Sequence, residues 1–227
     1  MDHRTGYREL HVVAGEGPFS GSALLWAVAL NAARREPGLL TARSLRDIDP
    51  AGVAELFSIG GETVADPERR ADLVRDLARG LERDHAGEAW SLLASASGRL
   101  GGDGGLLALL ARYEAYSDPL EKKSFLFAKI CERRRWLSIR DPERWQVSAD
   151  NVLMRLALRA GLVQPGPLDE VRAATRDAFK EVAERSGVAP PVLDDLLWEL
   201  GRDDPDLLGT EGGDLMEPPR DPASAWY

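Results

Sequence analysis

The sequence predicts an all-α fold, a single helical domain with at most a small β hairpin near the N-terminus. Three observations support this prediction. Apolar residues recur with helical spacing through residues 20–200, no alternating apolar runs could build a central sheet, and the one β-prone stretch is short. No repeat with a period of about 20 to 50 residues is present, so a solenoid is not indicated. We divide the domain 1–227 into a β-prone segment 7–18, a helical body 20–200 and an irregular tail 201–227.

The first elements are a β-prone stretch and a helix. Leu10-His11-Val12-Val13 has strand composition and ends at Gly15-Glu16-Gly17-Pro18, which is a turn signal. Ser20 is placed to cap a helix that runs through Arg34, and Pro37-Gly38 stops that helix.

Helical patterns continue along the rest of the body. A short helix follows Asp49-Pro50, and a longer amphipathic helix begins near Asp66-Pro67. The later helical patterns cover Trp90–Leu93, Leu106–Tyr113, Glu121–Trp136, Ser148–Arg159, Leu168–Arg185 and Pro191–Leu200. The tail is rich in Gly, Pro and Asp and is predicted to be irregular. A frayed tail is one interpretation, and the aromatic pair Trp226-Tyr227 favours the alternative that the end of the tail packs somewhere.

Composition narrows the function classes. Cys131 is the single cysteine, and His3, His11 and His85 are scattered, so we expect no disulfide, no metal site and no cofactor. The formal net charge of −9 argues against duplex nucleic acid as a partner, because that binding depends on Lys and Arg placed against phosphates. A small polar substrate or a protein partner fits this charge better. No apolar run is long enough to cross a membrane and no secretion signal opens the chain, so we expect a soluble, cytoplasmic protein.

The segment Ser148-Ala149-Asp150 is the first candidate for chemistry. We expect Ser148 to cap a helix and Asp150 to lie in its first turn, where backbone dipoles and N–H groups favour the ionised carboxylate. Such a carboxylate stabilises the oxocarbenium-like transition state of glycosidic cleavage. The alternative is that Asp150 only stabilises the helix N-terminus.

Three of the only four lysines in the whole chain, Lys122, Lys123 and Lys129, lie in the next candidate helix. Asp118 and Pro119 are placed to start this helix, and Lys122 and Lys129 share one of its faces. A lysine in partly apolar surroundings could bind an anion or attack a sugar carbon. The alternative is that both side chains extend into solvent.

A third candidate follows Pro190-Pro191. Asp194 and Asp195 are expected in or near a first helical turn, with Trp198 one turn after Asp194 on the same face. A carboxylate beside an indole suits a flat heterocycle, because the ring stacks while the acid accepts N–H bonds. Helix capping and core packing are the alternative.

These segments, taken in this order, resemble the queuosine salvage family of queuosine 5′-phosphate N-glycosylases. The likeness is carried by Phe19-Ser20-Gly21-Ser22-Ala23-Leu24-Leu25-Trp26 through Asn31, by the helix Glu121–Lys129, by Ser148-Ala149-Asp150, by Leu193-Asp194 with Leu197-Trp198, and by Trp226-Tyr227. The resemblance implies a helical fold related to the helix-hairpin-helix DNA glycosylases, a catalytic Asp150 and a base-binding Asp194.

Several positions depart from the pattern of that family. Ser148 stands where the family has an aromatic residue, Asp195 stands where it has Tyr, and Glu199 stands where it has Asp. The His-Arg-x-Arg of the family is replaced by Arg220-Asp221-Pro222-Ala223-Ser224.

Three hypotheses follow from this combination of segments. The first is a hydrolytic N-glycosidase that releases a purine or 7-deazapurine (queuine-like) base from a nucleoside or its 5′-phosphate. In it Asp150 is catalytic, and the substrate-binding residues are Asp194, Asp195, Trp198, Ser148, Glu199, Lys122 and Lys129. The second is a DNA base-excision glycosylase with Lys122 or Lys129 as the attacking amine. The third is a non-catalytic binding protein that retains the fold.

Overall fold

The computed structural model describes residues 5–216, and the chain is mostly helical, with 54% helix and 4% strand. This confirms the predicted helical character and the small N-terminal hairpin. Backbone contacts divide the chain into two compact units, one running up to Leu92 and including Tyr113–Ala115, the other comprising Leu93–Arg112 and the chain from Tyr116 onward. The predicted relationship to DNA glycosylases and the single-domain assignment both stay predictions.

The first unit opens with a two-stranded antiparallel hairpin of β1 (His11–Val13) and β2 (Glu16–Phe19). Ala14 and Gly15 form its turn, and both have positive φ, at 52° and 84°. A turn of two such residues matches the right-handed twist of the strands. The sequence placed the turn over residues 15–18, which is wrong, because most of that segment is the second strand.

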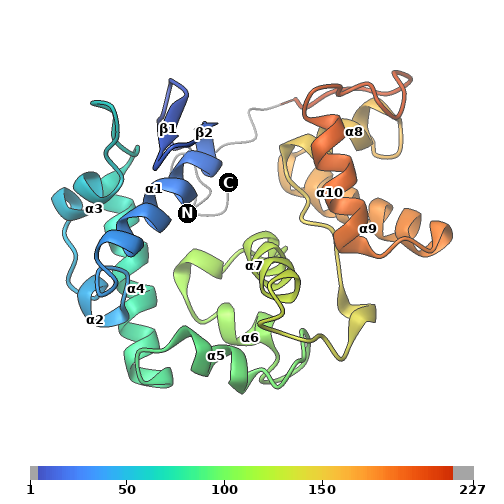
Figure 1. The fold of residues 1–227 in the computed structure, drawn as a ribbon. Coiled ribbons are helices and arrows are strands. Elements are labelled where there is room, and N and C mark those ends of the chain that lie inside the picture. Colours follow the sequence, from blue (N-terminus) through green and yellow to red (C-terminus); the bar gives the residue numbers. More distant parts are fainter. Residues whose placement is uncertain (1–4, 217–227) are drawn as a thin grey trace. The chain divides into compact units, whose positions relative to one another are not determined.

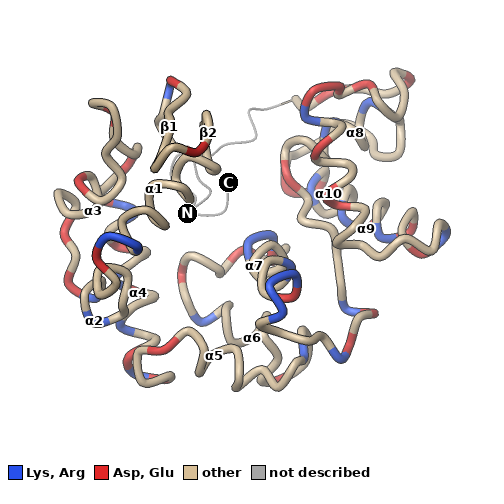
Figure 2. Tube along the Cα trace, viewed as in Figure 1, with Lys and Arg blue, Asp and Glu red and all other residues tan. Residues whose placement is uncertain are grey.

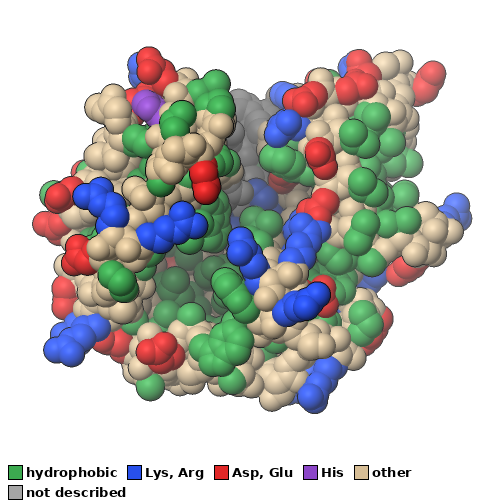
Figure 3. All heavy atoms as spheres, viewed as in Figure 1, with side chains coloured by type: hydrophobic (Ala, Val, Ile, Leu, Met, Phe, Trp, Pro, Cys, Tyr) green, Lys and Arg blue, Asp and Glu red, His purple; other side chains and the backbone are tan. Residues whose placement is uncertain are grey.

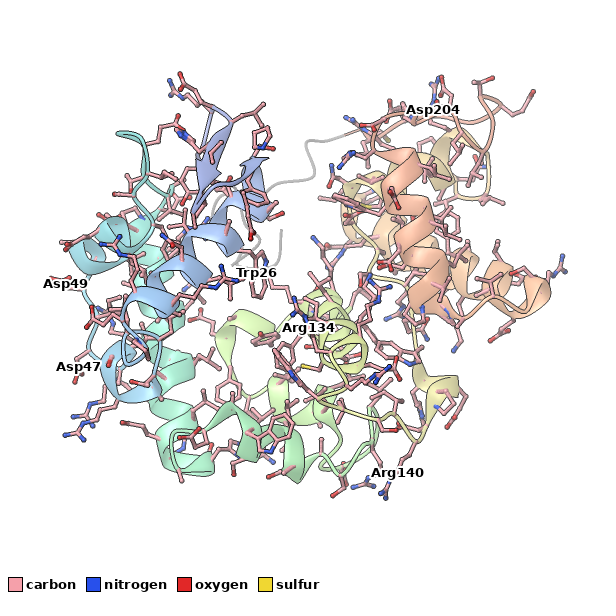
Figure 4. The ribbon with its side chains drawn as sticks, viewed as in Figure 1. Trp26, Asp47, Asp49, Arg134, Arg140 and Asp204 are labelled. Carbon is pink, nitrogen blue, oxygen red and sulfur yellow. The ribbon has the colours of Figure 1, made fainter. Side chains whose placement is uncertain are left out.

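Helices make up the rest of the first unit (Figure 1), namely α1 (Gly21–Arg35), α2 (Ala42–Leu45), α3 (Pro50–Leu56) and α4 (Pro67–His85). The long helix α4 packs against α2 and α3, while α1 packs against the hairpin and α3. Asp49 caps α3 by accepting a 2.7 Å hydrogen bond from the amide of Gly52 (Figure 4). Ser20 occupies the cap position of α1, but its side chain makes no capping hydrogen bond.

The boundary between the units falls within α5 (Ala89–Ser95), and the second unit continues with α6 (Leu106–Leu110) and α7 (Lys122–Arg133). It ends with α8 (Asn151–Arg159), α9 (Leu168–Ser186) and α10 (Pro190–Gly201), which pack together (Figure 1). The core lies around α8, where Leu153, Met154, Leu156 and Leu158 are fully buried. Gly201 lets α10 approach α8 closely, because a Cβ there would lie 2.4 Å from a methyl group of Leu156.

Two details of the second unit differ from the sequence prediction. The helix α7 begins at Lys122 with Glu121 in the cap position, so Asp118 and Pro119 do not start it. Residues 203–216 are irregular, as predicted for the tail, whereas Trp226-Tyr227 and the segment Arg220–Ser224 lie outside the described residues. None of the helices in residues 5–216 is long and apolar enough to span a bilayer.

Candidate active site

Asp150 is the N-cap residue of α8. Its backbone is extended, and its Oδ1 accepts hydrogen bonds from the amides of Val152 at 2.9 Å and Leu153 at 3.0 Å. The sequence prediction that Ser148 caps this helix is therefore wrong, because the carboxylate itself performs the capping. Within residues 5–216 no hydrogen bond reaches Oδ2 of Asp150, and the side chain is partly exposed. One oxygen is thus fixed by the helix while the other is available to a ligand.

The two residues before Asp150 are each held by a buried charged side chain. The amide of Ser148 donates to Oδ1 of Asp194 at 2.7 Å, and the carbonyl of Ala149 accepts from Nε of Arg172 at 3.2 Å. Ser148 and Ala149 are both buried. The backbone that carries Asp150 is therefore fixed by contacts from α9 and α10, which is the rigidity that a catalytic carboxylate needs.

Asp194 lies in the second turn of α10 rather than in the first turn predicted for it. It is only 5% exposed, and its two oxygens are both engaged, Oδ1 by Ser148 and Oδ2 by the ammonium of Lys129. Because a buried charge requires a partner, this arrangement accounts for both side chains in structural terms. The predicted contact between Asp194 and a base would require the carboxylate to exchange one of these partners.

The ion pair of Lys129 and Asp194 belongs to a network of four charged side chains. We call it the Lys129 network (Lys129, Arg133, Asp194 and Asp195). Lys129 is 6% exposed, and its Nζ also donates to Oδ1 of Asp195 at 2.7 Å. Arg133, one turn later on α7, pairs with the other oxygen of Asp195. Figure 2 shows several Lys and Arg positions along α7, and the space-filling view shows Lys and Arg side chains gathered over that helix (Figure 3).

A second buried ion pair was not predicted from the sequence. Asp118 and Arg172 are 3% and 2% exposed, and NH1 of Arg172 donates to Oδ1 of Asp118 at 2.7 Å. Asp118 also accepts from the amides of Leu120 and Lys122, so it closes the loop before α7 instead of capping a helix. Burial acts to raise the pKa of Asp118, but the guanidinium of Arg172 and the two amides outweigh it and hold the pKa below its ordinary value.

The electrostatic surroundings of Asp150 differ from those of a solvated cap. Burial raises the pKa of the Asp150 carboxyl above its ordinary value, and the negative charge of Asp194 adds to the increase. The amides of α8 act in the opposite direction, as the sequence predicted, and so does the ammonium of Lys122, but burial outweighs them. Perturbed carboxyl groups of this kind are typical of functional sites, although structural ion pairs also produce them.

The remaining predicted site residues lie on the outer side of α10. Trp198 is 42% exposed, and the guanidinium of Arg202 lies 5.2 Å from the centroid of its ring. Glu199 is exposed and its charge acts on Arg202. Hydrogen bonds thus connect Ser148, Asp194 and Asp195 with Lys129, whereas within residues 5–216 no hydrogen bond or ion pair joins Trp198 or Glu199 to that group. Their role in substrate binding stays a prediction.

Residues 5–216 contain no group of three or more His, Cys, Asp and Glu side chains arranged to hold a metal ion. Comparison of the sequence with known proteins found no matching family model and no matching curated protein.

Proposed function

We propose that this chain is a hydrolytic N-glycosidase of the queuosine salvage type, releasing a purine or 7-deazapurine base from a nucleoside or nucleoside 5′-phosphate. The observation that carries the proposal is the position of Asp150. One carboxylate oxygen is fixed by two amides of α8, the other makes no hydrogen bond within the described residues, and the preceding backbone is held at Ser148 and Ala149.

In the proposed reaction the bond between the sugar C1′ and the base nitrogen breaks, water supplies the hydroxyl that replaces the base at C1′, and the remaining proton of the water goes to the base nitrogen. Positive charge develops on the sugar as that bond lengthens, and a fixed carboxylate stabilises it without having to reorient. Asp150 takes this role as electrostatic stabiliser or as nucleophile. Lys129 and Arg172 are positioning residues, because their contacts reach the backbone before Asp150, at Ser148 through Asp194 and at Ala149 directly.

The alternative of a lysine-based DNA glycosylase has less support. The Lys129 ammonium lies between two carboxylates, so these ion pairs would have to break before the amine could attack a sugar carbon. Lys122 is the better candidate for this alternative, because its charge acts directly on Asp150. The third hypothesis, a non-catalytic binding protein, predicts nucleoside binding without base release.

Asp150→Asn tests the proposal. Release of free base from a panel of nucleosides and nucleoside 5′-phosphates is measured by chromatography, beside an abasic or damaged DNA duplex and an enzyme-free blank. We expect the variant to lose at least about 100-fold in rate, because the amide has the same shape but no negative charge. Asn is as good a helix cap as Asp, so folding should be retained. The matched control is Asp49→Asn, which makes the same change at the cap of α3 in the other unit.

The pH profile and borohydride trapping distinguish the hypotheses further. Since the ionised carboxylate is the active form and burial raises its pKa, activity should fall as the pH drops, with the fall centred above the ordinary Asp value of 3.8. Borohydride should trap no adduct, because only a Schiff base between lysine and sugar is reduced to a stable product. This proposal would be refuted by full activity in Asp150→Asn or by a borohydride adduct at Lys122 or Lys129.

A further inference from the structure

The second unit contains a cavity of about 440 Å³ that includes none of the residues assigned to the candidate active site above. It is formed by the glycine-rich loop before α6, the start of α7, the segment that ends in Gln146, and one face of α9. This volume is within the range of about 300 to 1,000 Å³ that is usual for small-molecule sites.

Three cationic side chains line this cavity, namely Arg144, Arg176 and Lys180. Arg176 and Lys180 are one turn apart on α9, where two like charges destabilise a helix unless an anion lies between them. Within residues 5–216 the side chains of Arg144 and Lys180 form no ion pair, and Arg176 contacts only the exposed carboxylate of its neighbour Asp177, at 3.3 Å. In the described part of the chain no ion pair therefore joins any of the three side chains to a carboxylate of the cavity lining.

The glycine-rich loop brings backbone close to these cations. Asp141 fixes the loop by accepting hydrogen bonds from the amides of Leu100 at 2.8 Å and Gly101 at 2.9 Å. Gly102 has a φ of +77°, which favours glycine, and a Cβ on Gly101 would lie 3.2 Å from the side chain of Arg144. The absence of side chains at this point lets Arg144 lie against the loop at the cavity wall.

Gln146 and two carboxylates, Glu121 and Asp103, also line the cavity. The Oε1 atom of Gln146 is buried and has no hydrogen-bond partner within residues 5–216, so the amide is available to a ligand in either orientation. Glu121 lines the cavity with a φ of 56°, an uncommon conformation for a residue that is not glycine. Its carboxylate lies among the cations, and the charge of Arg176 acts on it. It partly offsets the positive charge that an anion would meet.

We propose that this cavity binds the phosphate group of a small organic phosphate. Two guanidinium groups and an ammonium suit a phosphate, which accepts several charge-assisted hydrogen bonds at once. The volume exceeds what a single phosphate ion fills, and the apolar side chains of Phe125 and Leu107 form another part of the wall, against which the organic part packs. The site is separate from Asp150 and does not depend on the N-glycosidase proposal.

Binding of ribose 5-phosphate, inorganic phosphate and ribose, measured by isothermal titration calorimetry, tests this inference. We expect ribose 5-phosphate to bind more tightly than inorganic phosphate and ribose not to bind. Arg176→Gln combined with Lys180→Gln should weaken ribose 5-phosphate binding at least ~10-fold, since two charge-assisted contacts are lost. Arg185→Gln is the matched control, because it removes an exposed cation from the same helix.

Glu121→Gln should have the opposite effect and tighten binding severalfold, because it removes the negative charge that opposes the phosphate. A purely structural role of these residues would not give opposite signs, and circular dichroism with thermal unfolding shows that each variant is folded. The loss of ribose 5-phosphate affinity in the Arg176 and Lys180 double variant should be the same in the Asp150→Asn background, which separates this site from the proposed active site. The inference would be overturned if ribose 5-phosphate did not bind or bound only as tightly as inorganic phosphate. It would also be overturned if the Arg176 and Lys180 double variant kept its affinity, or if Glu121→Gln bound more weakly.

Discussion

Replacing Arg172 by Met is the sharpest test of how the backbone before Asp150 is held. The side chain is 2% exposed and supplies NH1 and NH2 to the carboxylate of Asp118 and Nε to the carbonyl of Ala149. Met fills much of the same volume but leaves Asp118 as a buried carboxylate supported only by two backbone amides. Removing one partner of a buried ion pair destabilises a protein by about 3 to 5 kcal/mol, and we expect a loss of that size.

The pH dependence of this loss identifies its cause. In the parent chain the lowered pKa of Asp118 contributes stability above the ordinary value of 3.8, and this contribution is lost as the pH falls through the lowered value. In Arg172→Met the guanidinium no longer opposes the effect of burial, so the pKa of Asp118 rises and its carboxyl takes up a proton as the pH falls. The difference in unfolding free energy between variant and parent should therefore be large near about pH 7 and shrink toward about pH 4.

Urea denaturation gives the measurement, with the fluorescence of Trp145, buried in the same unit, among its signals. The double variant Arg172→Met with Asp118→Asn serves as the control, because it removes both charges and should recover most of the stability lost in the single variant. A loss below about 1 kcal/mol in Arg172→Met, or a loss that does not change with pH, would refute the argument that this ion pair supports the site.

Two further predictions concern packing and titration elsewhere in the chain. Gly80→Ala should destabilise the first unit by about 1 to 3 kcal/mol in thermal unfolding, because its Cβ would lie 2.3 Å from the ring of the buried Tyr113. Gly38→Ala is the control and should be close to neutral, because no atom lies within 4 Å of its new Cβ. Burial raises the pKa of Cys131 to about 11 and that of Tyr116 to about 12, so Cys131 should resist iodoacetamide near about pH 8 until urea is added. Because both groups are held in their neutral forms, the unfolding free energy should also fall as the pH rises from about 9 toward 11, and a constant value over that interval would contradict the assignment.

The helices could be predicted from the sequence because their signals are local. The spacing of Leu153, Leu156 and Met154 along α8 gives its buried face, and Asp49-Pro50 marks the start of α3 within two residues. The starts that were misplaced are those where a tertiary contact competes with the local signal. Asp118 followed by Pro119 has the composition of a helix start, but Arg172 holds that carboxylate in the interior and α7 begins four residues later.

The same distinction separates the parts of the candidate site. Asp150 could be found from its neighbours, because a carboxylate just before an apolar helical stripe predicts a position at the helix N-terminus, and only the identity of the cap was misassigned. The ion pairs that hold it join residues 54 and 65 positions apart, a separation over which one sequence carries no pairing information. The burial of Arg172 could have been predicted from its position, since it lies beside Val171 on the buried stripe of α9 with Thr175 and Phe179.

An arginine on a buried helical stripe requires a carboxylate in the interior, and Asp118 is the one it meets. The same reasoning applies to Lys129 on the buried face of α7, which meets Asp194. Each pair also holds one backbone group next to Asp150, the carbonyl of Ala149 or the amide of Ser148. Because stability alone is served as well by apolar residues, we propose that these two buried ion pairs, which both bond the backbone of residues 148–149, position the carboxylate that follows them. That explanation requires the rate of base release, which depends on Asp150, to fall when either ion pair is broken. Arg172→Met with Asp118→Asn, which recovers stability but not the hydrogen bond to Ala149, should therefore still release base more slowly than the parent chain.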